Sequence, residues 1–265
     1  MTRISDLIQR FELFAPKNMA EMGDPVGLQL GNINNKVSKV MTTLDVRPEV
    51  VQEAIDKNVD FIFAHHPLMF RPAKNLDTTN PQNKMYADLL SHDITVYAAH
   101  TNLDNVVGGM NDWLADQLGL QKTISLVHTT SMDYGMGRVG NLKSEMTVAE
   151  FSEYCKQQFN LSGLRVISTD LTQSVKRVAI LGGDGGKFYP EAIKNQADVY
   201  VTGDVYYHTA HDMLAEGLSA VDPGHHIESI CKPQLKRLFD EWTIDNDWQI
   251  ETIESTINTD PFQFI

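Results

Sequence analysis

Two segments of the chain, 138 positions apart, repeat one pattern of apolar and polar residues without a gap. Residues 37–66 read VSKVMTTLDVRPEVVQEAIDKNVDFIFAHH, and residues 175–204 read VKRVAILGGDGGKFYPEAIKNQADVYVTGD. Each segment has an apolar run, a helical stretch with a shared Glu-Ala-Ile, and a second apolar run. This order within one short segment predicts a βαβ unit. The duplication therefore predicts an α/β protein of two related units, each with parallel strands.

The repeat also divides the chain. We expect a first α/β unit at residues 1–125, a connecting region at residues 126–174, and a second α/β unit at residues 175–265. The connecting region contains an amphipathic stretch at residues 148–159, which predicts a helix that Thr147 can cap. The tail from Trp248 onward has the composition of a strand, and we expect it to join one of the sheets.

Composition excludes several classes of partner. The formal net charge is −13 and no basic run occurs, which argues against binding a nucleic-acid backbone or an anionic membrane surface. No apolar stretch approaches the roughly 18 residues that a membrane-spanning helix needs. The amphipathic start of the chain is not typical of a signal peptide. Cys155 and Cys231 form no metal-binding spacing, so we expect a reduced, cytoplasmic protein.

The second apolar run of the first repeat ends in two histidines. Residues 60–67 read DFIFAHHP, so His65 and His66 stand at the carboxyl end of a continuous apolar strand. Ligands collect at the carboxyl ends of parallel strands, and imidazole is a common metal ligand. Adjacent strand residues point to opposite faces, so the two rings could serve two ions. A purely structural role for this pair stays open.

Two further strand ends carry residues of the same kind. The predicted strand at residues 94–99 is followed by His100 and Asp104, and the one at residues 218–221 is followed by His225, His226 and Glu228. A mixed set of nitrogen and oxygen ligands suits zinc, iron, manganese, cobalt or nickel. These donors exceed what one ion needs, and two bridged ions would support hydrolysis of a phosphoester, amide or purine-ring bond. Alternatively, Glu228 favours the dipole of a helix start.

The second repeat lacks histidines at the equivalent strand end, where Gly203 and Asp204 stand. Residues 202–204 and His208 could line the same cavity and bind or protonate a substrate, or they could form a satisfied turn. The glycine-rich residues 181–187, LGGDGGK, follow a strand and precede a helix. That position suits a phosphate on backbone amides, although a tight turn explains the glycines equally well.

Five motifs follow one another along the chain: GDPVGLQLG, AHHP, AHTNLD, VTGD and DPGHHIE. In this order they resemble the Nif-three-like family, whose members are often labelled GTP cyclohydrolase 1 type 2 homologues. The resemblance covers nearly the whole chain. It implies an α/β fold of two intertwined, internally duplicated units with mixed sheets, and a ring-shaped homohexamer with metal sites facing an internal cavity. Many members carry an inserted domain between the halves, which the short segment 126–174 leaves no room for.

The resemblance also implies a metal site with two divalent ions per subunit. The ligands that it implies are His65, His66, Asp104, His225 and Glu228. His100 matches a family histidine beside the metals, which suggests substrate contact or proton transfer. Some members space the last histidine and glutamate four apart, so His226 competes with His225 as a ligand.

These observations favour a metal-dependent hydrolase that acts on a small, nucleotide-like substrate. Opening the ring of GTP also needs a triphosphate site, yet only Arg71, Arg138 and Lys187 are basic among the residues near the motif loops. The alternative is therefore a metal-binding scaffold or metal-handling protein without turnover, which acts through protein partners. Direct regulation of DNA is disfavoured by the net charge of −13.

Overall fold

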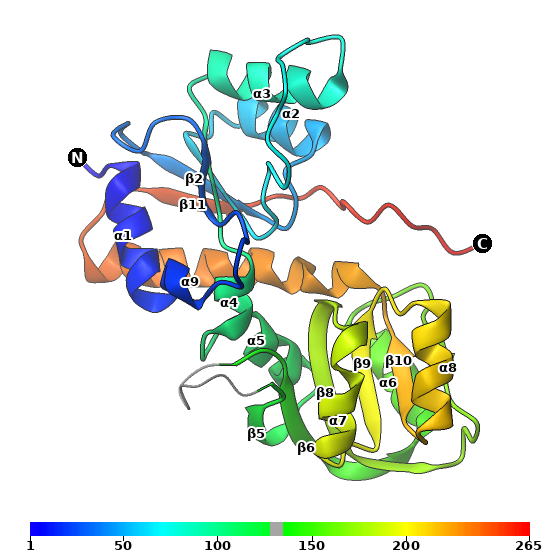
Figure 1. Cartoon of the computed structure of the whole chain (residues 1–265). Helices are drawn as coiled ribbons and strands as arrows, with labels where there is room; N and C mark the ends of the chain where they lie inside the picture. Colours follow the sequence, from blue (N-terminus) through cyan, green and yellow to red (C-terminus); the bar gives the residue numbers. More distant parts are fainter. Residues whose placement is uncertain (128–134) are drawn as a thin grey trace. The chain divides into compact units, whose positions relative to one another are not determined.

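The computed structural model describes residues 1–127 and 135–265, which form two compact units (Figure 1). Unit 1 comprises Met1–Leu103 and Cys231–Thr259, and unit 2 comprises Asp104–Ile230 and Asp260–Ile265. Each unit contains one sheet that mixes parallel and antiparallel strands. The α/β class with two mixed sheets is therefore confirmed. The sequence divisions at residues 125 and 174 stay a prediction, because they follow sequence similarity whereas the compact units follow contacts.

Unit 1 has a five-stranded sheet in the order β1-β4-β3-β2-β11. Its strands are β1 (Gly27–Leu30), β2 (Lys39–Thr43), β3 (Phe61–Ala64), β4 (Thr95–Ala98) and β11 (Glu251–Glu254). Its helices are α1 (Ile4–Phe14), α2 (Pro48–Asp56), α3 (Pro81–Ser91) and α9 (Cys231–Asp245), with a 3-10 turn at Lys17–Met19. Only β1 runs antiparallel to its neighbour, and β11 pairs in parallel with β2. The tail strand predicted from the sequence is thus confirmed.

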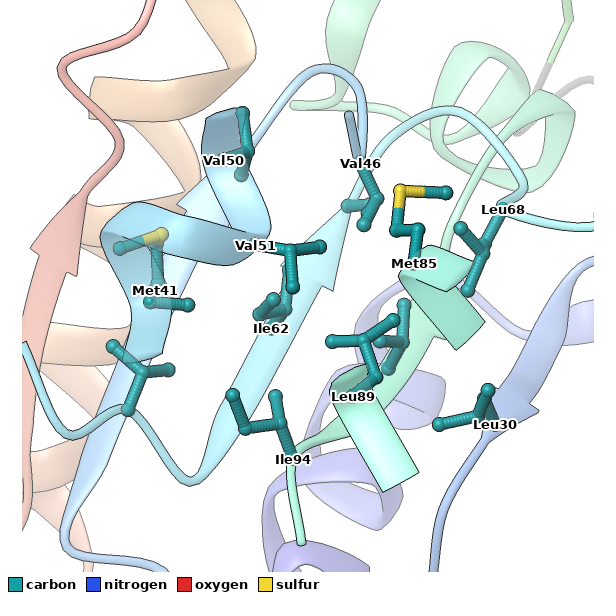
Figure 2. Close-up of a cluster of buried hydrophobic side chains, with 14 of the residues drawn as sticks. Leu30, Met41, Val46, Val50, Val51, Ile62, Leu68, Met85, Leu89 and Ile94 are labelled. Carbon is teal, nitrogen blue, oxygen red and sulfur yellow. The ribbon is translucent and has the colours of Figure 1, made fainter. Parts of the chain in front are cut away.

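The central strands of unit 1 are apolar on both faces because helices cover both. On one face α2 and α3 pack Val51 and Leu89 against Met41 and Ile62 of the sheet (Figure 2). On the other face, aromatic rings from α1 and α9 pack against Phe63, with centroid distances of 4.6 Å to Phe11 and 5.0 Å to Phe239. Tyr97 of the neighbouring strand β4 adds a third ring at 5.3 Å. Burial on both faces explains why β3 is a continuous apolar run without alternation.

Unit 2 has a six-stranded sheet in the order β5-β6-β8-β9-β10-β7. Its strands are β5 (Gln121–Ser125), β6 (Arg138–Thr147), β7 (Arg165–Ile167), β8 (Ser174–Asp184), β9 (Val199–Gly203) and β10 (Ser219–Asp222). Its helices are α5 (Met110–Gln117), α6 (Val148–Gln158), α7 (Tyr189–Lys194) and α8 (Tyr207–Ala215), with 3-10 helices at Gly186–Phe188 and His225–Ile230. The short helix α4 (Thr101–Asn105) spans the boundary between the units in sequence.

The predicted cap of the helix in the connecting region is confirmed. The amide of Glu150 donates to the Thr147 hydroxyl at 3.2 Å, and the Thr147 amide donates to the Glu150 carboxylate at 2.8 Å. These reciprocal bonds form a capping box, which satisfies two amides that a helix start otherwise leaves without partners.

The internal duplication extends to the strand register. In unit 1 Val40 lies opposite Phe61, and in unit 2 Val178 lies opposite Val199. Both members of the second pair follow those of the first by 138 positions, the same shift that aligns the sequences. The strand pairs β2–β3 and β8–β9 are both parallel, as a βαβ unit requires. The repeated unit is therefore a repeat of structure as well as of sequence.

One aspartate holds each repeated strand pair at its start. Asp60 accepts hydrogen bonds from the backbone amides of residues 38 and 39 at 2.7 and 2.9 Å. Asp198, 138 positions later, accepts bonds from the amides of residues 176 and 177 at 2.8 and 2.7 Å. Each carboxylate thereby satisfies amides at the start of the preceding strand. This shared contact explains why the repeat keeps an aspartate at this position.

None of the helices at residues 1–127 or 135–265 is long and apolar enough to cross a membrane.

The C-terminal strand is held in place by a buried glutamate of α2. Glu53 accepts bonds from the Ser255 hydroxyl at 2.6 Å, the Thr256 amide at 3.0 Å and the Thr256 hydroxyl at 2.6 Å. Lys57 also contacts this carboxylate at 2.7 Å. Burial alone raises the pKa of Glu53, but the hydrogen bonds outweigh burial and lower that pKa to about 2.

We expect Glu53→Gln to destabilise unit 1 by roughly 1–3 kcal/mol at neutral pH, because the charged acceptor of four bonds is lost. The folded pKa lies below the ordinary value of 4.5. The stabilisation is therefore present above pH 4.5 and lost as the pH falls toward 2. Hydrogen exchange of residues 251–257 at pH 7 and at pH 3 measures it, with the exposed Glu49→Gln on the same helix as control. Equal exchange in both variants would contradict the assignment.

Candidate metal centre

Three histidines meet at one end of the sheet in unit 1. His65 and His66 directly follow β3, and one residue, Ala99, separates His100 from the end of β4. Because β3 and β4 are adjacent and parallel, with Ala64 opposite Ala98, their carboxyl ends lie together. Each histidine offers one ring nitrogen, and the three nitrogens lie within 4.8 Å of one another. The structure thus brings these three residues together within unit 1, and their role as metal ligands stays a prediction.

A hydrogen bond fixes the ring of His65, whose side chain is fully buried. Its Nδ1 lies 2.8 Å from the carbonyl oxygen of Ala99. A carbonyl oxygen only accepts, so Nδ1 carries the proton. In the neutral imidazole the lone pair is then on Nε2, which is the usual arrangement of a metal-binding histidine.

His66 is oriented by a carboxylate. Its Nδ1 lies 2.7 Å from Oδ1 of Asp45, and the other oxygen of Asp45 accepts a bond from the Thr259 hydroxyl at 2.5 Å. Asp45 is therefore held from two directions, and it directs the ring of His66. Neither Asp45 nor Thr259 was predicted from the sequence, since neither belongs to a recognisable motif.

Asp24 performs the same task for His100. Its two oxygens lie 3.0 and 3.1 Å from Nδ1 of His100, and it also accepts bonds from the amide and hydroxyl of Thr101. The Asp24 side chain is only 5% exposed. Burial raises its pKa, but the bonds from His100 and Thr101 more than compensate and lower the pKa below its ordinary value. Asp24 thus stays ionised and orients the ring of His100 through Nδ1.

In unit 2 a histidine and a glutamate form a pair on the 3-10 helix that follows β10. Nδ1 of His225 lies 2.7 Å from Oδ2 of Asp204, and Nε2 lies 3.2 Å from Oε2 of Glu228. A neutral imidazole that donates from Nδ1 presents a lone pair at Nε2. A lone pair this close to a carboxylate oxygen requires a positive charge, which is either a second proton or a metal ion. The contact between His225 and Glu228 therefore fits the ligand set of a cation.

Asp104 is attached to the same region of unit 2 through Asn111. The amide nitrogen of the Asn111 side chain donates to the Asp104 carbonyl at 3.0 Å, and the Asn111 oxygen accepts the Gly182 amide at 3.1 Å. Asn111 is almost fully buried. It thereby ties Asp104 to the end of β8, beside Glu228, and this connecting role was missed in the sequence.

The first glycines of residues 181–187 make room for the ligand pair. A Cβ atom on Gly182 would lie 2.7 Å from Oε1 of Glu228, and one on Gly183 would lie 2.9 Å from the same oxygen. Gly183 also has a φ of +63°, which disfavours other residues. β8 continues through Asp184, so these glycines belong to the strand. Close approach to Glu228 explains them, which favours a structural interpretation over phosphate binding.

The strand end of the second repeat has mixed roles. The Thr202 hydroxyl accepts the Gly185 amide at 2.9 Å, which is a structural contact. Asp204 orients His225, a supporting role that lies between the two interpretations considered from the sequence. His208 is exposed on α8, with its ring centroid 5.4 Å from that of Tyr207.

The basic residues near the motif loops differ in whether they are available to bind an anionic ligand. Arg138 is buried and forms two bonds to the Asp112 carboxylate at 2.5 and 2.7 Å, so it is committed to the interior of unit 2. Lys187 stands over the ring of Phe188 at 4.9 Å. Arg71 is exposed. Arg138 is therefore not available to bind a triphosphate.

Four histidines share one feature that tests the fit of a metal ion. His65, His66, His100 and His225 each direct Nδ1 at an oxygen acceptor. This pattern holds Nε2 as the metal-binding atom, and three of the four acceptors are carboxylates, as in other histidine metal sites. The nitrogen and oxygen donors suit a divalent transition-metal ion. His225 has the contact with Glu228 that a shared ligand would make.

An α/β protein with ligand-type histidines and carboxylates at its strand ends is the class that this fold and these residues define. The chain belongs to the Duf34/NIF3 (NGG1p interacting factor 3) family, whose model matches residues 2–261. The resemblance drawn from the five motifs is thereby confirmed.

Named relatives and solved structures agree with this assignment. A "GTP cyclohydrolase 1 type 2 homolog" from Streptococcus pneumoniae is 44% identical over 264 residues, which cover 98% of this chain and 99% of the relative. The Lactococcus lactis protein of the same description is 43% identical, with 98% of each covered. A Bacillus cereus protein related to NIF3 has a similar structure, with a TM-score of 0.97, 31% identity, and 100% and 99% coverage.

A longer relative shows that members differ in length. The Listeria innocua protein, also a "GTP cyclohydrolase 1 type 2 homolog", is 36% identical in an alignment of 360 positions, which covers 96% of each chain. Since this chain has 265 residues, the relative contains residues with no counterpart here.

We expect Asp24→Asn to weaken divalent-metal binding about 10- to 100-fold, because an amide cannot accept from all the donors around Asp24. Competition between the protein and a chromophoric chelator for Zn²⁺ measures this, and the absorption spectrum of the Co²⁺ form reports the ligand field directly. Asp88→Asn, at a half-buried aspartate of α3, is the matched control. An unchanged affinity and an unchanged Co²⁺ spectrum would show that His100 needs no orientation by Asp24.

Gly182→Ala is expected to displace Glu228, because the added Cβ lies only 2.7 Å from its carboxylate oxygen. We expect metal affinity to fall about 10-fold or more, with a loss of roughly 1–3 kcal/mol in stability. Gly186→Ala in the same glycine-rich segment is the control, since its Cβ would lie 3.7 Å from its nearest neighbour. Chelator competition and thermal unfolding compare the two variants. Identical behaviour would contradict the close-approach explanation.

Proposed function

We propose that this chain binds two divalent metal ions and acts as a metal-dependent hydrolase on a small, nucleotide-like substrate. The ligands in this proposal are His65, His66, Asp104, His225 and Glu228. The observation that carries it is the orientation of the histidines, each of which directs Nδ1 at an oxygen acceptor and keeps Nε2 for a metal. The metal identity in this proposal is zinc, iron, manganese, cobalt or nickel.

The grouping of these five ligands in one proposal follows the sequence alone, in which each stands beyond the carboxyl end of a predicted strand. When bound, a pair of divalent ions lowers the pKa of a water and neutralises charge that develops on the substrate. The description of the relatives as GTP cyclohydrolase homologues supports a nucleotide-like substrate for this chain.

Within this proposal His100 moves the proton. Its Nδ1 is held by the ionised Asp24, so Nε2 is the atom that accepts a proton from water or returns one to a leaving group. The side chains of His66 and His100 are each 19% exposed, whereas His65 is fully buried. A substrate therefore approaches from the side of His66 and His100. Binding as a metal ligand is the alternative role of His100, since its ring nitrogen lies in the three-histidine group.

One observation favours the alternative, a metal-binding scaffold or metal-handling protein that acts through protein partners. Arg138, one of three basic residues near the motif loops, is committed to Asp112 and to backbone carbonyls. The triphosphate of GTP thus lacks one of its expected contacts. A homohexamer in the cytoplasm, without nucleic-acid or membrane partners, is part of either proposal.

We expect wild-type protein to contain about two equivalents of divalent metal, and His65→Ala to lose both metal and turnover. Elemental analysis measures the metal, and a screen against nucleotides and phosphoesters measures turnover. His92→Ala, which removes an exposed histidine at the end of α3, is the control. Metal without turnover in the wild type would favour the scaffold. Absence of metal from wild-type protein supplied with these ions would overturn both proposals.

A further inference from the structure

An exposed aromatic side chain stands beside the three histidines of unit 1. The ring centroid of Phe70 lies 5.5 Å from that of His100, and the two ring planes are nearly perpendicular at 81°. Phe70 is nevertheless 61% exposed. A large apolar side chain gains free energy when it is covered, so exposure beside a polar cluster needs an explanation.

The segment that carries Phe70 is held on both sides. Before it, the Met69 amide donates to the side chain of Gln29 at 3.1 Å. After it, the buried Asn83 donates to the Asn75 side chain at 3.1 Å and to the Asp77 carbonyl at 3.0 Å. Among the residues that the structure describes, residues 71–74 take part in no hydrogen bond. They form a short projection between two fixed points, so Phe70 is positioned without being covered.

The same projection carries two cations. Arg71 and Lys74 are both exposed, and neither has an ion-pair partner among the described residues. The chain as a whole has a net charge of −13, and several other cations contact carboxylates, as Lys84 does with Asp88. The surface of the protein is mostly acidic. Arg71 and Lys74, which follow Phe70 beside the three histidines of unit 1, are therefore a local exception to it.

We propose that residues 70–74 are the recognition element for the substrate, with Phe70 stacking on a planar ring and Arg71 binding an attached anionic group. This inference rests on the proposed function, because it takes the three-histidine cluster as the reacting end of the site. The perpendicular packing against His100 leaves a face of Phe70 available for stacking. A guanidinium matches a phosphate or carboxylate through paired hydrogen bonds, and Lys74 adds positive charge nearby.

The ligand class follows from these contacts. Stacking alone selects any flat ring, and an arginine alone selects any anion, whereas the pair selects a ring that carries an anionic substituent. The reacting bond then faces His100 and the metal-type cluster. A nucleoside monophosphate has this chemistry, and it is the probe that separates the two contributions.

Isothermal titration of metal-loaded, full-length protein with guanosine and adenosine 5′-monophosphates, the matching nucleosides and inorganic phosphate tests the inference. We expect Phe70→Ala to weaken binding of monophosphate and nucleoside about 10-fold, and Phe70→Tyr to retain it. Arg71→Ala should weaken monophosphate and phosphate but leave the nucleoside unchanged. Leu13→Ala and Arg237→Ala remove an exposed apolar residue and an exposed cation elsewhere in unit 1, and serve as controls.

Metal content is measured on every sample, which separates this inference from the proposed function. Two results would overturn the recognition element and leave the metal site unaffected. In the first, metal-containing wild-type protein binds none of the probes. In the second, metal-containing Phe70→Ala protein binds them as well as the wild type does. A change of molecular mass in solution for Phe70→Ala would assign Phe70 to a subunit contact and also overturn the inference. Wild-type protein without metal would instead remove the proposed function itself.

Discussion

The hydrogen bond from imidazole Nδ1 to an oxygen acceptor is the interaction on which the candidate site depends. An unrestrained histidine ring can rotate and can place its proton on either nitrogen. The acceptors remove this freedom for His65, His66 and His100, whose rings stand side by side at the carboxyl ends of β3 and β4. The parallel strands bring the residues together, but the acceptors decide which atom each ring presents. A site with the same residues and without these acceptors would bind a metal more weakly.

The strand end that the duplication repeats has a different role in each unit. Position 66 of the first repeat corresponds to position 204 of the second, and both lie directly beyond a buried parallel strand. His66 is a ligand-type residue that is oriented by a carboxylate. Asp204 is itself a carboxylate, and it orients His225. In unit 1 the repeated strand end therefore carries His66, a residue that can bind a metal. In unit 2 it carries Asp204, a carboxylate that orients such a residue, His225.

The sequence predicted the parts of the site that stand on regular structure. Apolar runs in the sequence predict β3 and β4, so the positions of His65, His66 and His100 could be predicted from the strand ends alone. The supporting residues carry no such signal. Asp24 precedes His100 by 76 residues in a loop, and only the folded chain brings the two together. The glycines of residues 181–187 were ambiguous for a related reason: the sequence shows where side chains are missing, but it cannot show that Glu228 occupies the space.

The distribution of charge on the protein connects the three histidines of unit 1 to the kind of ligand that can bind beside them. A net charge of −13 repels anions from most of the surface, and the cations Arg138 and Lys57 are neutralised by Asp112 and Glu53. An anionic ligand is therefore favoured only where positive charge remains. Divalent ions at the histidines would supply such charge, and Arg71 adds a second source a few residues along the chain from His66. In the proposed recognition the ligand engages both sources, so a ligand with its anion at the wrong distance from its reacting bond is expected to bind less well, and the acidic background sharpens that selection.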